Sequence, residues 1–147
     1  MPDNLFAASS NELKRSTKSI GDLAEAHALV ALMRAGYHVS IPFGENNRYD
    51  LIVERDGVLS RVQVKAGRVR GGAVLFNCYS SHAHRGGSSC RSYTGEIDFF
   101  AVYCIDNEVV YLIPIEELAA KGGSLRVEPT KNNQTKRIRW AESYALS

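Results

Sequence analysis

The sequence predicts one domain of the α/β class, more closely α+β, which carries a long basic loop. Three observations support this prediction. The chain has 147 residues, of which 44% are hydrophobic, and this suits a single compact domain with a buried core. One strong helical pattern lies near the N-terminus. Most of the remaining chain consists of short apolar segments separated by turn signals, as expected for strands.

We expect residues 1–18 to form a loose arm or a short helix, and residues 19–147 to form the single domain. The first strong element is a helix that begins at Ser19, where an S-x-x-D pattern resembles a capping box. Alanine and leucine fill its interior, and Gly36 suits its C-terminal end. These features together predict one continuous helix.

The chain after the helix reads as strands and turns. Two strands, Tyr49–Arg55 and Val58–Lys65, flank Asp56-Gly57, which is the strongest short hairpin signal. The segment from 80 to 95 is rich in serine, glycine and arginine, lacks periodicity, and is predicted to be a long binding loop. The other predicted elements are strands over 38–43, 74–79, 99–105, 109–115 and 125–127, a short helix over 115–121, and a basic tail over 131–139.

The net charge of +2 conceals an uneven distribution. No acidic residue lies between Gly57 and Gly95, so all 16 acids belong to the rest of the chain. The block from 57 to 95 carries the cations Arg61, Lys65, Arg68, Arg70, Arg85 and Arg91. A concentrated block of this kind indicates an anionic partner.

Localisation is predicted from what the sequence lacks. No apolar run approaches the about 20 residues needed to span a bilayer, and the N-terminus lacks a secretory pattern. The three cysteines form no C-x-x-C pair, which disfavours a disulfide framework. We therefore expect an intracellular protein of the cytoplasm or nucleoid, without a membrane partner.

The predicted hairpin brings three chemically active side chains together. A two-residue turn pairs Arg55 with Val58, and the same register places Asp50 directly opposite Gln63. Lys65 then lies diagonally across from Asp50 on the same face. A carboxylate, an amide oxygen and an ammonium group thus converge. An ordinary cross-strand ion pair is the alternative interpretation of Asp50 and Lys65.

The predicted helix offers a second carboxylate. At 100° per residue, Glu25 lies on the apolar arc that includes Ala28 and Leu32, whereas His27 and Arg34 mark the side expected to face solvent. A carboxylate on an apolar face requires a cation, a metal or hydrogen-bond donors. The hairpin provides a candidate metal site, and a nearby arginine or lysine is the alternative partner.

Two carboxylates, an amide oxygen and a lysine ammonium in one place suit the hydrolysis of a phosphodiester bond. Carboxylate and carbonyl oxygens hold Mg²⁺, which lowers the pKa of a bound water and screens the phosphate charge. A lysine beside the metal can orient the attacking water and stabilise the transition state. The basic block would hold the nucleic-acid backbone.

These residues resemble a known family. A helix with Glu25, the stretch YDLIV with Asp50, and the stretch VQVK with Gln63 and Lys65 are similar, in that order, to the PD-(D/E)XK nucleases. Within that superfamily the sequence looks most like the homing endonucleases of group I introns, which show glutamine in the (D/E)XK half. The stretch YTGEIDFFAVYCIDNEVVYLIPIEEL also looks like this branch, so the resemblance covers about residues 19–118.

The resemblance implies a restriction-endonuclease-like core, with a central mixed β-sheet flanked by helices. It also implies Mg²⁺-dependent cleavage of double-stranded DNA, with Mn²⁺ as a substitute and with 5′-phosphate and 3′-hydroxyl ends. Asp50 and the Val64 carbonyl would ligate the metal, Gln63 would contribute its amide oxygen or a bridging water, and Glu25 would bind the metal or its water. Lys65 would serve the nucleophile.

Two features depart from the family pattern. Tyr49 stands where the proline of the "PD" half is expected, and Gln63 removes one negative charge from the metal site. The missing charge keeps a DNA-binding module with a decayed active site as an alternative. A Holliday-junction resolvase is the other alternative, since such enzymes share the fold and the helix glutamate, although they usually carry an acid at the position of Gln63. Because each chain has one active site, cutting two strands implies a homo-oligomer, either a dimer or a tetramer.

The predicted DNA contacts come from the basic block and one aromatic ring: Arg61, Arg68, Arg70, Arg85, Arg91 and Tyr93. No zinc site is expected, because the C-x3-H-x-H-x5-C spacing of Cys78, His82, His84 and Cys90 does not match common structural zinc sites.

Overall fold

A computed structural model describes residues 16–118, 122–134, 136 and 138–146 of the chain. Within these residues the fold has one α-helix, α1 (Thr17–Arg34), a seven-stranded sheet and a separate two-stranded sheet. The strands are β1 (His38–Ser40), β2 (Leu51–Arg55), β3 (Val58–Arg70), β4 (Ala73–Phe76), β5 (Tyr79–His84), β6 (Gly87–Ser92), β7 (Phe99–Cys104), β8 (Val109–Pro114) and β9 (Gly123–Arg126), with 3-10 turns at Ile115–Glu117 and Ala141–Ser143.

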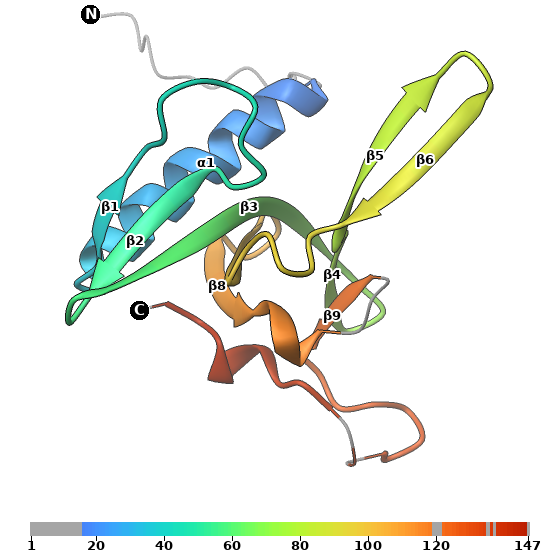
Figure 1. Ribbon diagram of the computed structural model, residues 1–147. Helices are drawn as coiled ribbons and strands as arrows, with labels where there is room; N and C mark the ends of the chain where they lie inside the picture. The colour runs from blue at the N-terminus through green and yellow to red at the C-terminus, as the bar shows by residue number, and fades with distance from the viewer. Residues whose placement is uncertain (1–15, 119–121, 135, 137, 147) are drawn as a thin grey trace, which may run out of the picture.

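Strand β3 organises the large sheet (Figure 1). Its residues 58–62 pair antiparallel with β2, residues 62–67 pair parallel with β7, and the last three residues pair antiparallel with β4. Strand β1 extends the sheet beyond β2, β8 extends it beyond β7, and β9 extends it beyond β4. The parallel β3–β7 pair makes the sheet mixed, which confirms the predicted fold class.

Helix α1 covers one face of this sheet. Its buried residues Ala24, Ala28 and Leu32 pack against apolar side chains of β2, β3, β7 and β8. The helix begins earlier than predicted because Ser16 is its N-cap: the Ser16 hydroxyl accepts a hydrogen bond from the Ser19 backbone N–H at 3.2 Å. Gly36 has a φ of +91° just beyond the helix, so the predicted C-terminal stop is confirmed.

The predicted solvent position of His27 is wrong. Its ring stacks on Tyr103 of β7, with ring centroids 4.1 Å apart and an angle of 8° between the planes. Tyr103 itself is buried under the helix. The apolar arc of α1 is therefore wider than the spacing of alanine and leucine indicates, because an imidazole also packs against the sheet.

The opposite face of the sheet is covered without a second α-helix in the described part of the chain. Apolar residues of β4, β7, β8 and β9 form this second core, together with Cys78, Tyr93 and Ile97 from the connecting segments and Ala141 from the last 3-10 turn. The predicted flanking helices are thus represented by α1 alone among the described residues. The predicted helix over 115–121 is a 3-10 turn over Ile115–Glu117, and residues 119–121 lie outside the described part.

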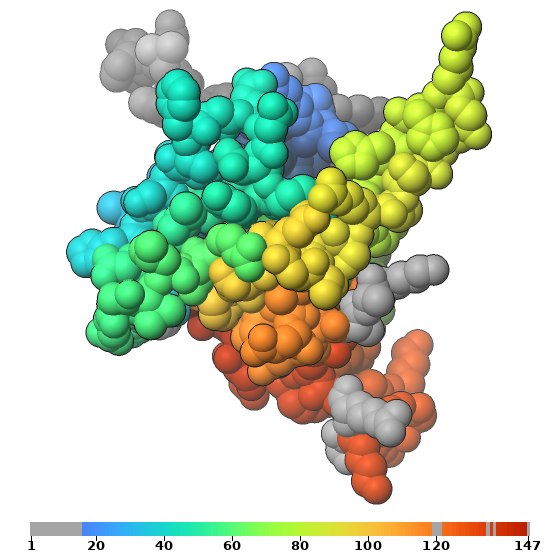
Figure 2. Space-filling model, in the orientation of Figure 1, coloured from blue at the N-terminus to red at the C-terminus, as the bar shows by residue number. Residues whose placement is uncertain are grey.

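The segment predicted as a long loop is a β-hairpin. Strands β5 and β6 pair from Tyr79↔Ser92 to His84↔Gly87 around a two-residue turn at Arg85-Gly86. The hairpin projects from the body of the molecule (Figures 1 and 2). Ten of its 12 strand residues are exposed. The sequence shows no alternation here because neither face of the ribbon is buried.

Candidate active site and nucleic-acid interface

The site begins where β2 separates from β3. The predicted register is confirmed, since Arg55 pairs with Val58 and the ladder ends at Leu51↔Val62. Asp50 lies one residue outside β2, and its backbone N–H donates to the Val62 carbonyl at 2.9 Å. Its carboxylate Oδ2 accepts the Val64 backbone N–H at 2.9 Å. The Asp50 side chain therefore continues the β3 hydrogen bonding after β2 has ended.

This arrangement directs the Val64 carbonyl toward Asp50. The N–H and C=O groups of one strand residue point to the same side, and the Val64 N–H already points to Asp50. The Gln63 amide Nε2 donates to the Val64 carbonyl at 3.4 Å, which places the Gln63 amide beside it. The structure thus brings together the Asp50 carboxylate, the Val64 carbonyl and the Gln63 amide.

Glu25 approaches from the helix side. It is half-buried and lines a cavity of about 180 Å³ with Asp22 and Leu51, the residue that follows Asp50. Burial raises the pKa of Glu25, and the negative charges of Asp50 and Asp22 raise it further. The negative charge of Asp50 therefore disfavours the ionised form of Glu25.

Burial also raises the pKa of Asp50, although the hydrogen bond from Val64 and the charge of Lys65 oppose the increase. Such a carboxylate favours a cation as a neighbour. The described residues contain no group of three or more His, Cys, Asp or Glu side chains arranged to hold a metal ion. A cation here would consequently rely on the two carboxylates and the neutral oxygens of Val64 and Gln63.

Lys65 lies on the same face of β3 as Gln63, but it is held by the projecting hairpin. Its Nζ donates to the Tyr79 backbone carbonyl at 3.3 Å and to the Tyr93 hydroxyl at 3.2 Å. It also lies 4.8 Å from the centroid of the Tyr93 ring. No ion pair joins Lys65 to Asp50, both of which lie in the described part of the chain, so the simple cross-strand ion pair is not observed.

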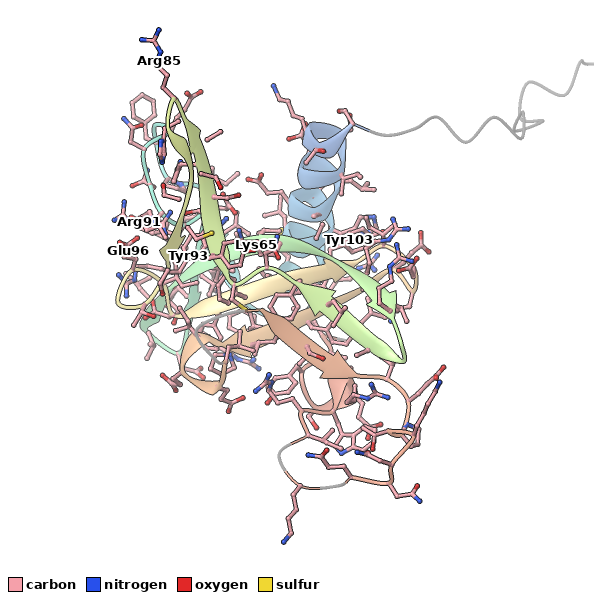
Figure 3. The ribbon with its side chains drawn as sticks, turned by 90° about the vertical axis from the view of Figure 1, so that its right-hand side faces the viewer. Lys65, Arg85, Arg91, Tyr93, Glu96 and Tyr103 are labelled. Atoms are coloured by element: carbon pink, nitrogen blue, oxygen red, sulfur yellow. The ribbon has the colours of Figure 1, made fainter. Side chains whose placement is uncertain are left out.

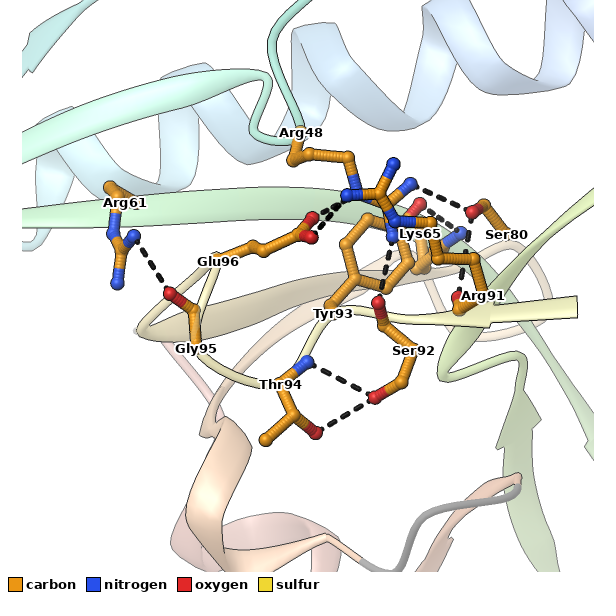
Figure 4. A network of polar contacts seen from close by, with 10 residues as sticks. All are labelled: Arg48, Arg61, Lys65, Ser80, Arg91, Ser92, Tyr93, Thr94, Gly95 and Glu96. Atoms are coloured by element: carbon orange, nitrogen blue, oxygen red, sulfur yellow. Dashed lines mark hydrogen bonds and ion pairs between the residues drawn. The ribbon is translucent and has the colours of Figure 1, made fainter.

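Arg48 is the functional candidate that sequence reasoning missed. Its guanidinium pairs with the Glu96 carboxylate, donates to the Ser80 hydroxyl at 2.7 Å and to the Ser92 carbonyl at 2.9 Å, and lies 4.1 Å from the Tyr93 ring centroid (Figure 4). These partners follow Arg48 by 32 to 48 residues, so no local pattern could reveal them.

The predicted DNA-contacting cations separate into two groups. Three pair with acids that follow the basic block in sequence: Arg61 with Asp98 at 3.2 Å, Arg68 with Asp106 at 3.5 Å, and Arg91 with Glu96. In contrast, Arg85 stands at the exposed end of the hairpin, far from the base that holds Lys65 (Figure 3), and Arg70 is exposed at the end of β3.

The expected contact between Tyr93 and a DNA base does not agree with the structure. Tyr93 is only 4% exposed, and its ring packs edge-on against Phe100 with centroids 5.5 Å apart. Arg48 and Lys65 occupy positions next to the ring. The ring is therefore part of the core and of the lysine environment, and it is not available for stacking on a base.

The cysteine and histidine residues of the C-x3-H-x-H-x5-C segment do not share one environment. Cys78 is buried in the core, whereas His82, His84 and Cys90 are exposed on the projecting hairpin. Among the described residues, no helix is both long enough and apolar enough to cross a membrane.

Comparison with known proteins identifies the family and the fold. Residues 15–147 match the profile of the PD-(D/E)XK endonuclease family. No curated protein matches the chain. Among solved structures, the fold is similar to "The structure of a bacterial homing endonuclease: I-Ssp6803I", with 24% identity, 89% of each chain covered and a TM-score of 0.73. The ordered series of Glu25, Asp50, Gln63 and Lys65 is thus carried by the expected fold, and the chain belongs to the PD-(D/E)XK endonuclease family.

Proposed function

We propose that the chain is a divalent-metal-dependent endonuclease that hydrolyses phosphodiester bonds in double-stranded DNA. The observation that supports this most strongly is the set of groups at the β2–β3 separation. There the Asp50 carboxylate, the Val64 carbonyl and the Gln63 amide converge, with Lys65 on the same strand. Membership of an endonuclease family agrees with the proposal.

The residues suit a hard cation such as Mg²⁺. All the available donors are oxygens, and Mg²⁺ binds one or two carboxylates while it retains several waters. Asp50 and the Val64 carbonyl would hold the ion directly, and Glu25 and Gln63 would hold it or its waters. When bound, the ion supplies a water of lowered pKa and screens the charge of the phosphate.

The protein side chains have separate tasks in this scheme. Lys65 places a positive charge beside the carboxylates, where it can stabilise the negative charge that develops on the phosphate. Asp50 must lose its proton before it binds a cation, so its raised pKa makes cation binding dependent on pH. Gln63 contributes an oxygen without a negative charge, which weakens the attraction for the ion relative to an acid.

The projecting hairpin and β3 present Arg85 and Arg70 to a DNA backbone. A two-stranded ribbon can enter the major groove of B-DNA, and exposed arginines can bind phosphates or guanine edges. We further propose a homing role, which is supported by the similarity of the fold to that of a bacterial homing endonuclease. Because each chain supplies one site, cutting both strands requires a homo-oligomer, a dimer or a tetramer.

The proposal is tested with purified protein, Mg²⁺ and a plasmid library with randomised inserts. The wild type is expected to linearise a subset of the plasmids. Asp50→Ala and Lys65→Ala are expected to bind those plasmids without cutting them. Glu54→Gln serves as the control, since Glu54 lies on β2 outside the proposed site.

Each alternative function has a distinct result in this experiment. Tight DNA binding without cleavage, unchanged by Gln63→Glu, would identify a binding module and contradict the proposal. A strong preference for branched over linear DNA would identify a structure-selective nuclease of the resolvase type. Cleavage that persists in Asp50→Ala would show that the site is assigned to the wrong residues.

A further inference from the structure

Tyr93 connects the protein core to the lysine of the proposed site. It follows β6 directly, and its side chain is buried. The ring is fixed by an edge-on contact with Phe100 of β7. Its hydroxyl accepts a hydrogen bond from the Lys65 ammonium at 3.2 Å. A rigid core residue therefore fixes one of the two acceptors that hold Lys65.

The second acceptor belongs to the other strand of the same hairpin. The Tyr79 carbonyl, which accepts from Lys65 at 3.3 Å, is at the first residue of β5. Tyr79 pairs with Ser92, the last residue of β6 and the neighbour of Tyr93. The first residue of β5 and the residue that follows β6 thus bind the Lys65 ammonium at the base of the ribbon whose far end carries Arg85.

Arg48 ties this base to the segment that carries Asp50. It binds Ser80 on β5 and Ser92 on β6, and it lies two residues before Asp50 in the chain. Its side chain is 20% exposed and lies over the Tyr93 ring. The metal-facing carboxylate and the acceptors of the lysine are therefore connected by one arginine.

We propose that Tyr93 is a positioning residue for Lys65, which it holds by its hydroxyl at the base of the β5–β6 hairpin. The inference rests on the proposed nuclease function. The geometry explains why a buried tyrosine ends an otherwise exposed ribbon. Tyr93 would influence the cleavage step and leave the affinity for DNA unaltered.

If the contacts of Tyr93 restrained Lys65 or served only the core, the experimental result would be different. If Tyr93 held Lys65 away from the phosphate, loss of its hydroxyl would accelerate cleavage. If Tyr93 served only the core, loss of the hydroxyl would change the melting temperature and leave the cleavage rate unaltered. The Tyr93→Phe variant separates these effects because it retains the ring that packs on Phe100.

The experiment uses a plasmid that the wild-type protein cuts, selected from the library of randomised inserts. Single-turnover cleavage is measured with Mg²⁺ at saturating protein, and affinity is measured without metal. For Tyr93→Phe we expect cleavage to be slower by about 10-fold or more, the scale of one hydrogen bond to a charged group, with affinity changed by less than about twofold. Tyr37→Phe is the matched control, because the Tyr37 ring packs against Arg55 far along the hairpin of β2 and β3.

The outcomes separate this inference from the function on which it rests. Wild-type cleavage that is lost in Lys65→Met, together with normal or faster cleavage by Tyr93→Phe, would overturn the positioning role alone. A loss of affinity equal to the loss of rate would also overturn it. Failure of the wild type to cut any plasmid would overturn both the nuclease function and the inference.

Discussion

At the scale of single residues, the proposed site contains two carboxylates, Asp50 and Glu25, whose ionised forms the surrounding protein disfavours. Asp50 is partly buried, and its carboxylate has the Val64 N–H as its hydrogen-bond donor. Burial nevertheless raises its pKa above the ordinary value, and Glu25 is affected in the same way. An arrangement that costs stability in the free protein but suits a bound cation is typical of a functional site.

The first prediction concerns Asp50→Asn in the absence of metal. Because the folded-state pKa of Asp50 is raised, its ionisation reduces the free energy of unfolding as pH rises above the ordinary value of 3.8. The asparagine variant lacks this cost and can still accept the Val64 N–H. We expect it to be more stable than the wild type at pH 7 by about 0.5–1 kcal/mol, and inactive.

Thermal unfolding at pH 7 and at a pH well below 3.8 measures this effect. The stability gain should disappear at the lower pH, where Asp50 is protonated in both states. Mg²⁺ should then raise the melting temperature of the wild type and leave that of Asp50→Asn unchanged. A less stable variant at pH 7 would contradict the assigned cost of burial.

The second prediction concerns Gln63→Glu, which restores the missing acid of the family pattern. The added carboxylate lies beside the Val64 carbonyl and increases the attraction for a divalent cation. We expect half-maximal cleavage at a Mg²⁺ concentration about 10-fold lower than for the wild type, the change that about 1.4 kcal/mol produces. A Mg²⁺ titration of cleavage tests this, and an unaltered midpoint would place Gln63 outside the metal environment.

At the scale of elements, the two hairpins show what a sequence pattern can and cannot predict. The β2–β3 hairpin is predictable because Asp56-Gly57 fixes the turn between two apolar segments, in which Leu51, Val53 and Val62 are buried against α1. The β5–β6 hairpin has the same backbone pairing but no buried face. Its serine, histidine and arginine residues therefore carry no periodic signal.

The third prediction concerns the exposed end of the β5–β6 hairpin. Arg85→Ala should weaken DNA binding and reduce the slope of log affinity against log salt by about 1, as expected for the loss of one phosphate contact. Arg55→Ala, on the hairpin of β2 and β3, should leave the slope unchanged. Fluorescence anisotropy over a salt series measures both slopes, and equal slopes for wild type and Arg85→Ala would remove Arg85 from the interface.

At the scale of the whole molecule, β3 connects the two cores and carries the site between them. Val62 and Val64 pack toward α1, whereas the opposite face adjoins the core formed by β4, β7 and β9. Gly67 lies where β3 leaves β7 and approaches β4. A Cβ at this position would come within 2.9 Å of both Val102 and Val74.

The fourth prediction follows from this close approach. Gly67→Ala should lower the free energy of unfolding by about 1–3 kcal/mol, because the valines of β4 and β7 must move. Gly21→Ala is the matched control: no atom lies within 4 Å of the added methyl group on α1, so stability should rise by about 0.5–1 kcal/mol. Chemical denaturation measures both changes, and similar effects for the two variants would contradict this view of β3.

The arrangement of the candidate site residues was predictable from the sequence, whereas the contacts of the surrounding cations were not. Asp50, Gln63 and Lys65 follow from one hairpin register, and Glu25 follows from helical spacing and the family resemblance. The partners of the basic block are Glu96, Asp98 and Asp106, which lie outside that block in sequence and reach it only through tertiary structure. The partners of Arg48 are likewise distant in sequence and come close only in the folded chain. Because such partners neutralise several of the cations, the distribution of charge along the sequence does not by itself locate the DNA-binding surface.

The central claim is that Asp50 and the Val64 carbonyl hold a divalent cation next to Lys65. Its most direct test is anomalous diffraction from crystals of the protein grown with Mn²⁺ and a cleaved DNA substrate. We predict an anomalous peak within coordination distance of an Asp50 carboxylate oxygen and the Val64 carbonyl oxygen, with the DNA phosphate beside it. A Mn²⁺ peak at the cut phosphate that is bound by other residues, with Asp50 and Val64 free of metal, would contradict the account.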